Sequence, residues 1–178
     1  SFTRYDLISS PQFIGIENYV EMFKDELFIK SLLNTIKYVI VTVPLKLAFA
    51  LFIASILNFK IKGVGIFRTA YYLPSILGGS VAISVLWRFL FADNGLVNIM
   101  LKMLHLPTAS WMGDQKYALF TIGLLSVWQF GSSMVIFLAA LKNIPNTLYE
   151  AARIDGASKV RMFFSITFPL LTPVIFFN

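Results

Sequence analysis

Three long apolar runs limit the folds open to this chain more than any other feature of its sequence. Residues 35–57, 71–91 and 117–141 consist mostly of apolar side chains, and charges gather at or between the ends of the runs. At about 1.5 Å per helical residue, roughly 20 residues cross the hydrocarbon core of a bilayer. The runs therefore predict three membrane-spanning helices, and a further apolar run starts at Pro169.

The composition supports a membrane protein and excludes other classes. Hydrophobic residues make up 57% of the chain and charged residues 13%, with a mean hydropathy of +0.75. A soluble domain carries about a quarter charged residues. The net charge of +6 comes from basic residues in loops, without the interleaved aromatic residues of a nucleic-acid-binding patch, so no nucleic-acid partner is expected. We predict an all-α polytopic membrane protein surrounded by a lipid bilayer.

The ends of the sequence suggest a piece of a longer protein. The chain starts at Ser1 without an initiator methionine and stops at Asn178 inside an apolar run. We expect a fold that is incomplete at both ends, with one span missing before Ser1 and at least one after Asn178. Residues 1–30 would then form an extracytoplasmic segment, and residues 31–178 the transmembrane domain.

The charges between the apolar runs predict the orientation in the membrane. Residues 58–69 carry only basic charges, and residues 142–168 are predominantly basic. Cytoplasmic loops are enriched in lysine and arginine, so both segments are expected in the cytoplasm. The net-acidic residues 1–30 and residues 92–116 are then expected outside.

Two single residues, Lys46 and His105, are candidates for a functional role. Lys46 lies near the middle of the first run, where an ionisable side chain is costly and should face other helices or water. It could line a solute pathway or pair with another helix, and the sequence leaves both open. His105 is the only histidine and has no second ligand at a matching spacing, so we expect no metal site, no cofactor and no catalytic residue.

The polar residues 142–168 predict two short helices joined at a glycine. Pro145 suits a helix entrance, and Thr147 with Glu150 three residues later has the spacing of a capping box. Gly156 suits the left-handed conformation that ends a helix. A second helix then follows, with one face formed by Val160, Phe163, Phe164 and Thr167.

The middle of the third run is unusually polar. In a continuous helix, Trp128 and Ser132 would share one face, and Gln129 and Ser133 another. An aromatic face with amide and hydroxyl partners suits a sugar, and Ser132 would lie about 27 Å along a helix from Glu150, near mid-membrane. We therefore assign Trp128, Gln129 and Ser132 to a substrate path. Alternatively, the polar side chains hydrogen-bond to neighbouring helices.

One motif resembles a known family. Residues 150–152 read Glu-Ala-Ala, Gly156 follows after three residues, and residues 166–169 read Ile-Thr-Phe-Pro after nine more. This pattern resembles the EAA loop of the permease subunits of bacterial ABC importers, although the family usually has Leu before the final Pro. Asp155 before Gly156 resembles the branch that imports maltose, glycerol-phosphate or oligosaccharides. Further matching segments lie at residues 13–19 and 67–74.

In that family the loop is a cytoplasmic coupling helix that docks into a cleft of the ATPase. The resemblance assigns this docking to six residues: Glu150, Ala151, Ala152, Asp155, Gly156 and Ala157. It also implies the helical bundle of a type I importer permease in the bacterial inner membrane. The expected partners are two ATPase subunits, a second permease subunit of a different chain, an extracytoplasmic solute-binding protein and a sugar. The chain has no phosphate-binding loop, so ATP hydrolysis is expected in the separate ATPase.

Two other functions are compatible with parts of the sequence. The chain could be an ABC permease for a solute other than a sugar, although Asp155 and the polar, aromatic middle of the third run favour a sugar. It could also be an ATP-independent carrier or channel. Such proteins use intramembrane carboxylates or broken half-helices, and no Asp or Glu lies within the three predicted spans.

Overall fold

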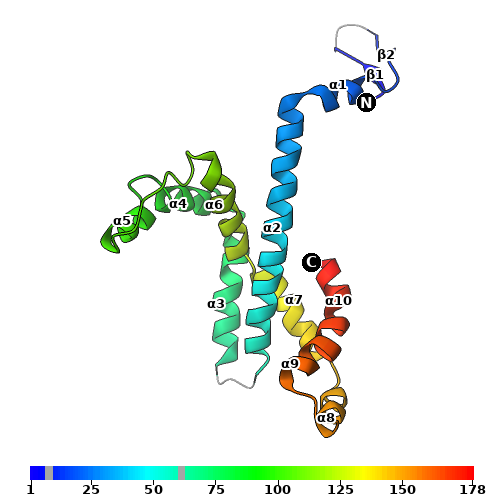
Figure 1. Ribbon diagram of the computed structural model, residues 1–178, viewed down its shortest axis with the longest axis vertical. Helices are drawn as coiled ribbons and strands as arrows, with labels where there is room; N and C mark the ends of the chain where they lie inside the picture. The colour runs from blue at the N-terminus through cyan, green and yellow to red at the C-terminus, as the bar shows by residue number, and fades with distance from the viewer. Residues whose placement is uncertain (7–9, 60–62) are drawn as a thin grey trace. The chain divides into compact units, whose positions relative to one another are not determined.

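The computed structural model describes residues 1–6, 10–59 and 63–178. These form two compact units, Ser1–Ile40 and Val41–Asn178. Apart from one short hairpin, the described residues are helical where they are regular (Figure 1). The all-α class predicted from the apolar runs is therefore confirmed.

The first unit begins with a small antiparallel hairpin. Strands β1 (Thr3–Arg4) and β2 (Gln12–Phe13) pair with Thr3 opposite Phe13. Helix α1 (Glu17–Lys24) is tied to the first strand by Asn18, whose amide donates to the carbonyl oxygens of Ser1 and Thr3 at 2.8 and 3.2 Å. Helix α2 (Glu26–Leu57) starts in this unit and continues into the second, and it does not end at Pro44.

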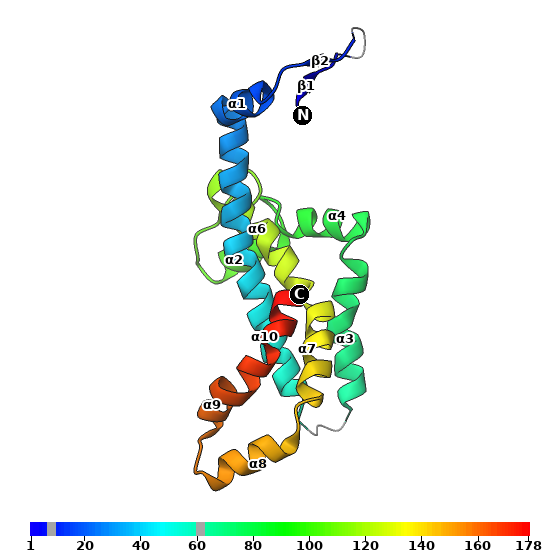
Figure 2. The same cartoon turned by 90° about the vertical axis from the view of Figure 1, so that its right-hand side faces the viewer.

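The second unit contains the remaining helices. In chain order they are α3 (Val64–Leu77), α4 (Val81–Leu90), α5 (Leu96–Met103), α6 (Gln115–Trp128), α7 (Gly131–Lys142), α8 (Asn146–Ile154), α9 (Lys159–Met162), the π-helix η1 (Phe163–Thr167) and α10 (Phe168–Phe177). Helix α7 packs against both α3 and α10 (Figure 2).

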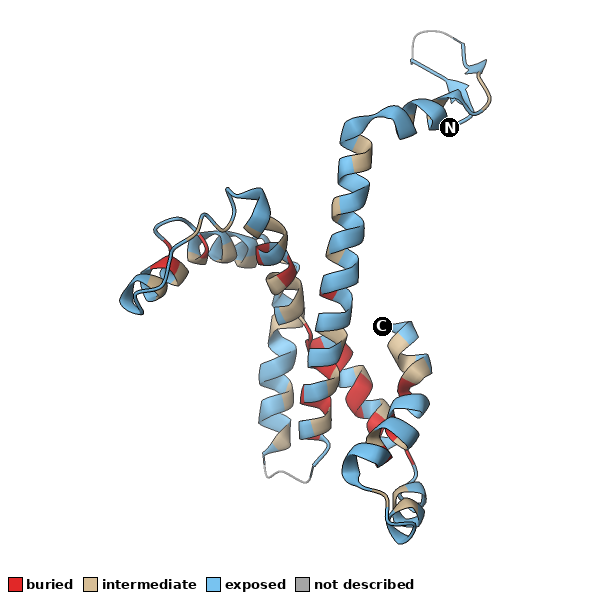
Figure 3. Cartoon of the chain, in the orientation of Figure 1, coloured by how far each residue is buried: buried red, intermediate tan, exposed pale blue. Residues whose placement is uncertain are grey.

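The apolar core of this unit is centred on α7 and the last turns of α2. Figure 3 shows buried residues concentrated in these two helices. The core is formed by Ala50, Ile53, Ala54, Leu57, Phe130, Met134, Phe137, Leu138, Leu141, Ile144 and Leu171. Many large apolar side chains remain uncovered, for example Ile66 and Phe176 at 76% and 86% exposure. In a chain of this hydropathy, such faces suit contact with lipid or further helices.

Two helices are long and apolar enough to cross a membrane unbroken. These are Glu26–Leu57 and the continuous run Lys159–Phe177, which includes the π-helix. Two helix pairs, α3 with α4 and α6 with α7, also meet the criteria but are bent by 97° and 45°. The described residues thus hold two candidate spans, or up to four if each bent pair counts as one.

The run at residues 71–91, expected as one span, is divided. Helix α3 ends at Leu77, and Ser80 adopts an extended conformation and caps α4, its Oγ accepting from the Ile83 amide at 3.3 Å. Serine favours the N-cap, and the two glycines before it disfavour continued helix. The local residues thus start a new helix inside an otherwise apolar run.

A buried amide organises the segment after α4. The Asn98 side chain donates to the carbonyl oxygens of Asp93 and Ala109 and accepts from the Ala109 amide and the Trp111 indole. Asn98 is 2% exposed, and these four bonds satisfy its amide group. Trp111 in turn accepts from Thr121 of α6 through its carbonyl oxygen at 3.0 Å, which ties this segment to the helix that follows.

Candidate functional site

The predicted coupling loop forms a short helix between two turns. Helix α8 begins after Pro145, which is the N-cap with φ −61° and ψ 131°. Thr147 lies inside the helix, and no side chain caps the helix start. The predicted capping box of Thr147 and Glu150 is therefore wrong: Pro145 sets the helix start two residues earlier, so Thr147 is no longer at the position where a capping hydroxyl is useful.

The end of α8 is closed as the sequence predicts. Gly156 has a φ of +74°, the left-handed conformation. The Ala157 amide donates to the Ala152 carbonyl at 2.9 Å and the Gly156 amide to the Arg153 carbonyl at 3.0 Å. These two bonds form a Schellman motif, which satisfies the last carbonyl groups of the helix. Ser158 then caps α9, its Oγ accepting from the Arg161 amide.

The second predicted helix is not a separate element. Helix α9, the π-helix and α10 run continuously from Lys159 to Phe177. Pro169 lies in the first turn of α10, where its missing amide is tolerated because the π-helix has already altered the hydrogen-bond ladder. The loop therefore turns at Gly156 and leads directly into a candidate membrane span.

Three of the six predicted docking residues line a small pocket. Ala152, Asp155 and Ala157 border a cavity of about 280 Å³. The remaining lining residues come from the following helix, and the sequence reading had missed them as site residues: Arg161, Met162, Ser165 and Ile166. Glu150, Ala151 and Gly156 lie outside this pocket and are exposed. The loop thus presents a polar notch flanked by an accessible helix face.

The predicted substrate-path residues lie where two helix breaks meet. The α3–α4 break and the α6–α7 break are joined by three hydrogen bonds. Ser75 Oγ donates to the Gln129 carbonyl and accepts from the Ser132 amide, each at 3.0 Å, and Gln129 Nε2 donates to the Gly78 carbonyl at 3.3 Å. Backbone groups freed by both breaks therefore find partners on the facing helix.

Two glycines let these helices approach closely. A Cβ on Gly131 would clash with the Tyr71 carbonyl oxygen and lie within 2.8 Å of the Tyr72 Cα. A Cβ on Gly78 would clash with the side chain of Gln129. Small residues at helix contacts are typical of membrane bundles. This junction is thus a tightly packed structural contact as well as a polar site.

The break changes how the three substrate-path residues are arranged. Helix α6 ends at Trp128, so Trp128 and Ser132 do not share one continuous helix. The Gln129 side-chain amide donates to the Gly78 carbonyl, as expected if the polar side chains of this run hydrogen-bond to neighbouring helices. Trp128 is 36% exposed and its ring lies 6.1 Å from that of Trp87. The Trp128 indole and the Ser132 hydroxyl make no hydrogen bond to any residue that the structure describes, so both are available to a ligand.

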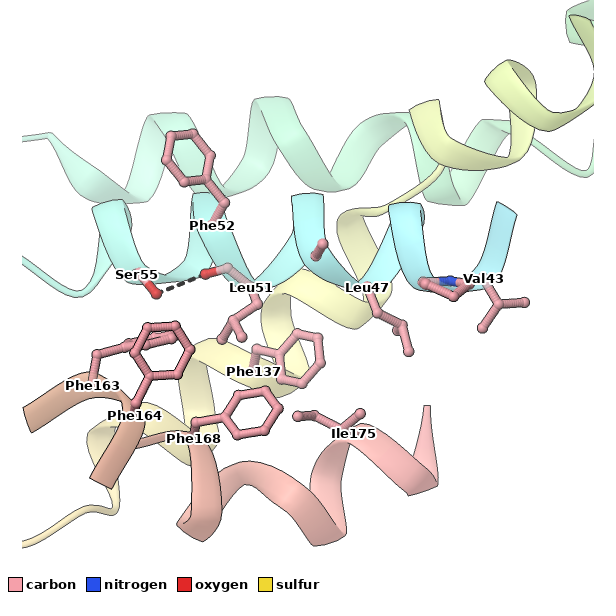
Figure 4. Close-up of a pocket in the computed structure, with 12 residues that line it drawn as sticks. Val43, Leu47, Leu51, Phe52, Ser55, Phe137, Phe163, Phe164, Phe168 and Ile175 are labelled. Carbon is pink, nitrogen blue, oxygen red and sulfur yellow. Dashed lines mark hydrogen bonds between the residues drawn. The ribbon is translucent and has the colours of Figure 1, made fainter. Parts of the chain in front are cut away.

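A separate groove of about 690 Å³ runs between α2, α7 and the last helix. In Figure 4, Leu47 and Leu51 of α2 point toward Phe168 and Ile175. Its lining is almost entirely apolar, and its one hydroxyl, that of Ser55, donates to its own helix at the Leu51 carbonyl. A sugar needs hydrogen-bond partners, so this groove does not have the chemistry of a sugar site.

Lys46 is partly buried beside this region. It makes no ion pair with any residue described in the structure, where the salt bridges join Arg4 to Glu17 and Glu21. Both roles of Lys46, pairing with another helix and lining a solute path, therefore stay predictions. Among the described residues no group of histidines, cysteines and carboxylates could hold a metal ion.

Comparison with known proteins identifies the family. Residues 27–178 match the family model described as binding-protein-dependent transport system inner membrane component. The chain belongs to this family. It is 54% identical over its full length to the probable ABC transporter permease protein YesP of Bacillus subtilis. It is 39% identical to the sn-glycerol-3-phosphate transport system permease protein UgpA of Yersinia pestis and 36% identical to the lactose transport system permease protein LacF of Rhizobium radiobacter, each over 94% of the chain.

A solved structure agrees with this assignment. The chain superimposes with a TM-score of 0.78, at 26% identity over 92% of its length, on a bacterial ABC transporter involved in the import of the acidic polysaccharide alginate. This permease chain thus has an ABC importer permease fold and is a multi-pass inner membrane component, as the resemblance implied. It spans 57 to 58% of the length of these curated relatives and of the solved chain.

Proposed function

We propose that this permease chain is the membrane-spanning part of an ATP-driven importer for a sugar or sugar-like solute. Residues 142–168 would couple it to a separate ATPase subunit. The observation that carries this proposal is helix α8: an exposed helix, closed at Gly156 by a Schellman motif and followed after that turn by the candidate membrane span Lys159–Phe177. The exposed face of α8 can bind a partner protein, and displacement of α8 can then move the membrane helix that follows it.

The notch beside α8 suits a protein side chain. Asp155, Arg161 and Ser165 offer charged and hydroxyl groups around small Ala152 and Ala157. A protruding side chain of the ATPase could enter between the two alanines and hydrogen-bond to the polar rim. We assign docking to Glu150, Ala151, Ala152, Asp155, Gly156 and Ala157, and we add Arg161 and Ser165.

The relatives support a carbohydrate substrate. Their printed names refer to lactose, sn-glycerol-3-phosphate and alginate. A related crystal structure holds a bacterial alginate ABC transporter with a periplasmic protein that carries an alginate pentasaccharide. By analogy, we propose two ATPase subunits, a second permease chain and a solute-binding protein as partners. Trp128 and Ser132 would contact the solute, while Gln129 holds the helix break beside them.

The coupling function can be tested by co-purifying the full-length protein with its ATPase. Wild type is compared with Glu150→Lys, which reverses a charge on the exposed face, and with Gly156→Val, which strains the left-handed turn. We expect both variants to reach the membrane at normal levels and to lose ATPase association. Absence of ATPase from the wild-type complex would instead favour an ATP-independent carrier or channel.

The substrate class can be tested in proteoliposomes that contain the complete importer. Uptake of lactose, sn-glycerol 3-phosphate and alginate oligosaccharide is measured for wild type, Trp128→Ala and Ser132→Ala. We expect uptake of one of these probes, and an increase in its KM of about tenfold for Trp128→Ala, since burying an aromatic side chain contributes on the order of 1.5 kcal/mol. Uptake of an amino acid or of inorganic phosphate in place of all three probes would support the permease for another solute.

A further inference from the structure

A partly buried hydroxyl pair links helix α8 to the last membrane helix. The Tyr149 hydroxyl of α8 lies 2.8 Å from Thr167 Oγ1, at the end of the π-helix. Thr167 is 6% exposed, and the Tyr149 ring packs against the apolar core. Among the described residues, this is the one hydrogen bond between a side chain of α8 and a side chain of another helix.

Thr167 differs from three other helical threonines of this chain, whose hydroxyls bond within their own helices. Thr35, Thr69 and Thr172 each donate to the carbonyl oxygen four residues earlier in their own helix. Thr167 has Tyr149, 18 residues away in sequence, as its hydrogen-bond partner. A threonine hydroxyl in a helix can bond to a carbonyl oxygen of the preceding turn. Its use for a contact with α8 therefore indicates a specific link between the two segments.

The link acts on an irregular turn. The π-helix Phe163–Thr167 interrupts the α-helical hydrogen-bond pattern between α9 and α10. Such single π turns are rare and are often found at functional sites. The neighbouring rings of Phe163, Phe164 and Phe168 line the groove against α2 (Figure 4). One face of the turn thus contacts α8 and another faces a membrane helix.

We propose that Tyr149 is a positioning residue that transmits movement of α8 to α10 through Thr167. This inference rests on the proposed coupling function and deepens it. When the ATPase displaces α8, the Tyr149–Thr167 hydrogen bond moves the π turn with it, and α10 shifts as a result. The docking residues hold the partner, whereas Tyr149 carries the displacement into the membrane. Neither residue touches the ATPase or the solute in this role.

A spin label on α10 tests this transmission without knowledge of the solute. Phe176 is 86% exposed on α10, and this chain contains no cysteine. Phe176→Cys therefore provides a single labelling site in this part of the protein. Any cysteines elsewhere in the full-length protein are replaced first. The full-length importer is assembled with its ATPase in nanodiscs. The nitroxide spectrum is recorded before and after addition of a non-hydrolysable ATP analogue. The wild-type protein is expected to show a nucleotide-dependent change.

Three variants remove or restore the hydroxyl pair. Tyr149→Phe and Thr167→Val delete one hydroxyl each and keep the side-chain volume, whereas Thr167→Ser restores the hydroxyl. Both deletions are expected to reduce the nucleotide-dependent change at least threefold, with ATPase association unchanged. Combining them should add little, because both remove the same bond. Thr167→Ser should behave as wild type. Thr172→Val is the matched control, since its hydroxyl bonds only within its own helix.

The outcomes separate this inference from the function on which it rests. Loss of the spectral change in both deletions, with ATPase still bound and Thr172→Val normal, supports the transmission role. A full spectral change in both deletions, additive losses, or an α10 that does not respond to nucleotide in wild type would overturn it while leaving the coupling function intact. Failure of the wild-type protein to bind the ATPase would overturn both.

Discussion

The turn after α8 and the junction of the two helix breaks both depend on glycine, but for different physical reasons. Gly156 has a φ of +74° and nothing within 4 Å of the place where a Cβ would lie. Gly131 has no left-handed backbone, but its Cβ would clash with the backbone of Tyr71. The first position needs conformational freedom and the second needs space. The coupling loop is therefore defined locally, whereas the junction is defined by tertiary contact.

The largest expected effect is at the junction. Gly131→Val would force a branched side chain against the Tyr71 carbonyl and the Tyr72 Cα, and backbone atoms cannot move aside cheaply. We expect a loss of about 3 kcal/mol in folding stability, the upper range for overpacking. It is measured as a lower melting temperature of the detergent-solubilised full-length protein. Gly79→Ala is the control, because nothing lies within 4 Å of that position; equal melting of the two variants would contradict the close contact.

Ser75 tests the hydrogen bonds at the same junction. Ser75→Ala leaves the Gln129 carbonyl and the Ser132 amide without their partner. Unsatisfied backbone groups inside a membrane bundle are costly, and we expect a loss of about 1.5 kcal/mol. Ser55→Ala serves as the matched variant, since the Ser55 hydroxyl bonds only to Leu51 of its own helix. Chemical denaturation of both variants measures the difference, and identical midpoints would mean that Ser75 does not join the breaks.

The sequence separation of the contacting residues explains which parts of the architecture the sequence could predict. The turn at Gly156 was predictable because glycine, the preceding helix and the Schellman bonds lie within a few residues of one another. The division of residues 71–91 was not predicted, although Gly78, Gly79 and Ser80 were visible, because the apolar run continues across them. Ser75 and Gln129 are separated by 54 residues, so only the folded structure brings them together.

The candidate site follows the same rule. Three docking residues, Ala152, Asp155 and Ala157, lie together because they are close in sequence around one turn. Arg161 and Ser165 complete the notch from the next helix, where the motif gave no signal. Trp128 and Ser132 were paired on the assumption of one continuous helix, and the break at Gln129 removes that assumption. Local periodicity cannot foresee a break that is stabilised from another helix.

The turn after α8 should respond differently from the junction. Gly156→Ala has room for its methyl group but places an L-residue in the left-handed region, which costs about 1 kcal/mol. Gly156→Asn should cost less, because asparagine adopts this conformation more readily. Since the strain is confined to the loop, we expect ATPase affinity to fall about fivefold for the alanine variant while the melting temperature of the membrane domain is unchanged. Titration calorimetry with the purified ATPase measures the affinity, and a tighter Gly156→Ala than Gly156→Asn complex would refute the conformational role.

The smallest effect is expected at Thr147, and it tests whether α8 is capped at Pro145, as in the structure, or at Thr147, as the sequence predicted. If Thr147 were the N-cap, Thr147→Ala would remove a capping hydrogen bond and cost about 1 kcal/mol. In the structure Pro145 is the N-cap and Thr147 is an exposed residue inside α8. Alanine is the better helix former at such a position, so Thr147→Ala should change stability by less than about 0.5 kcal/mol and leave ATPase affinity unaltered. Ser158→Ala provides the comparison, because Ser158 does cap α9. Hydrogen exchange is measured at the amides of the first turn of each helix. We expect faster exchange in α9 of Ser158→Ala and no change in α8 of Thr147→Ala. Faster exchange in α8 of Thr147→Ala, with α9 of Ser158→Ala unchanged, would support the capping box of Thr147 and Glu150.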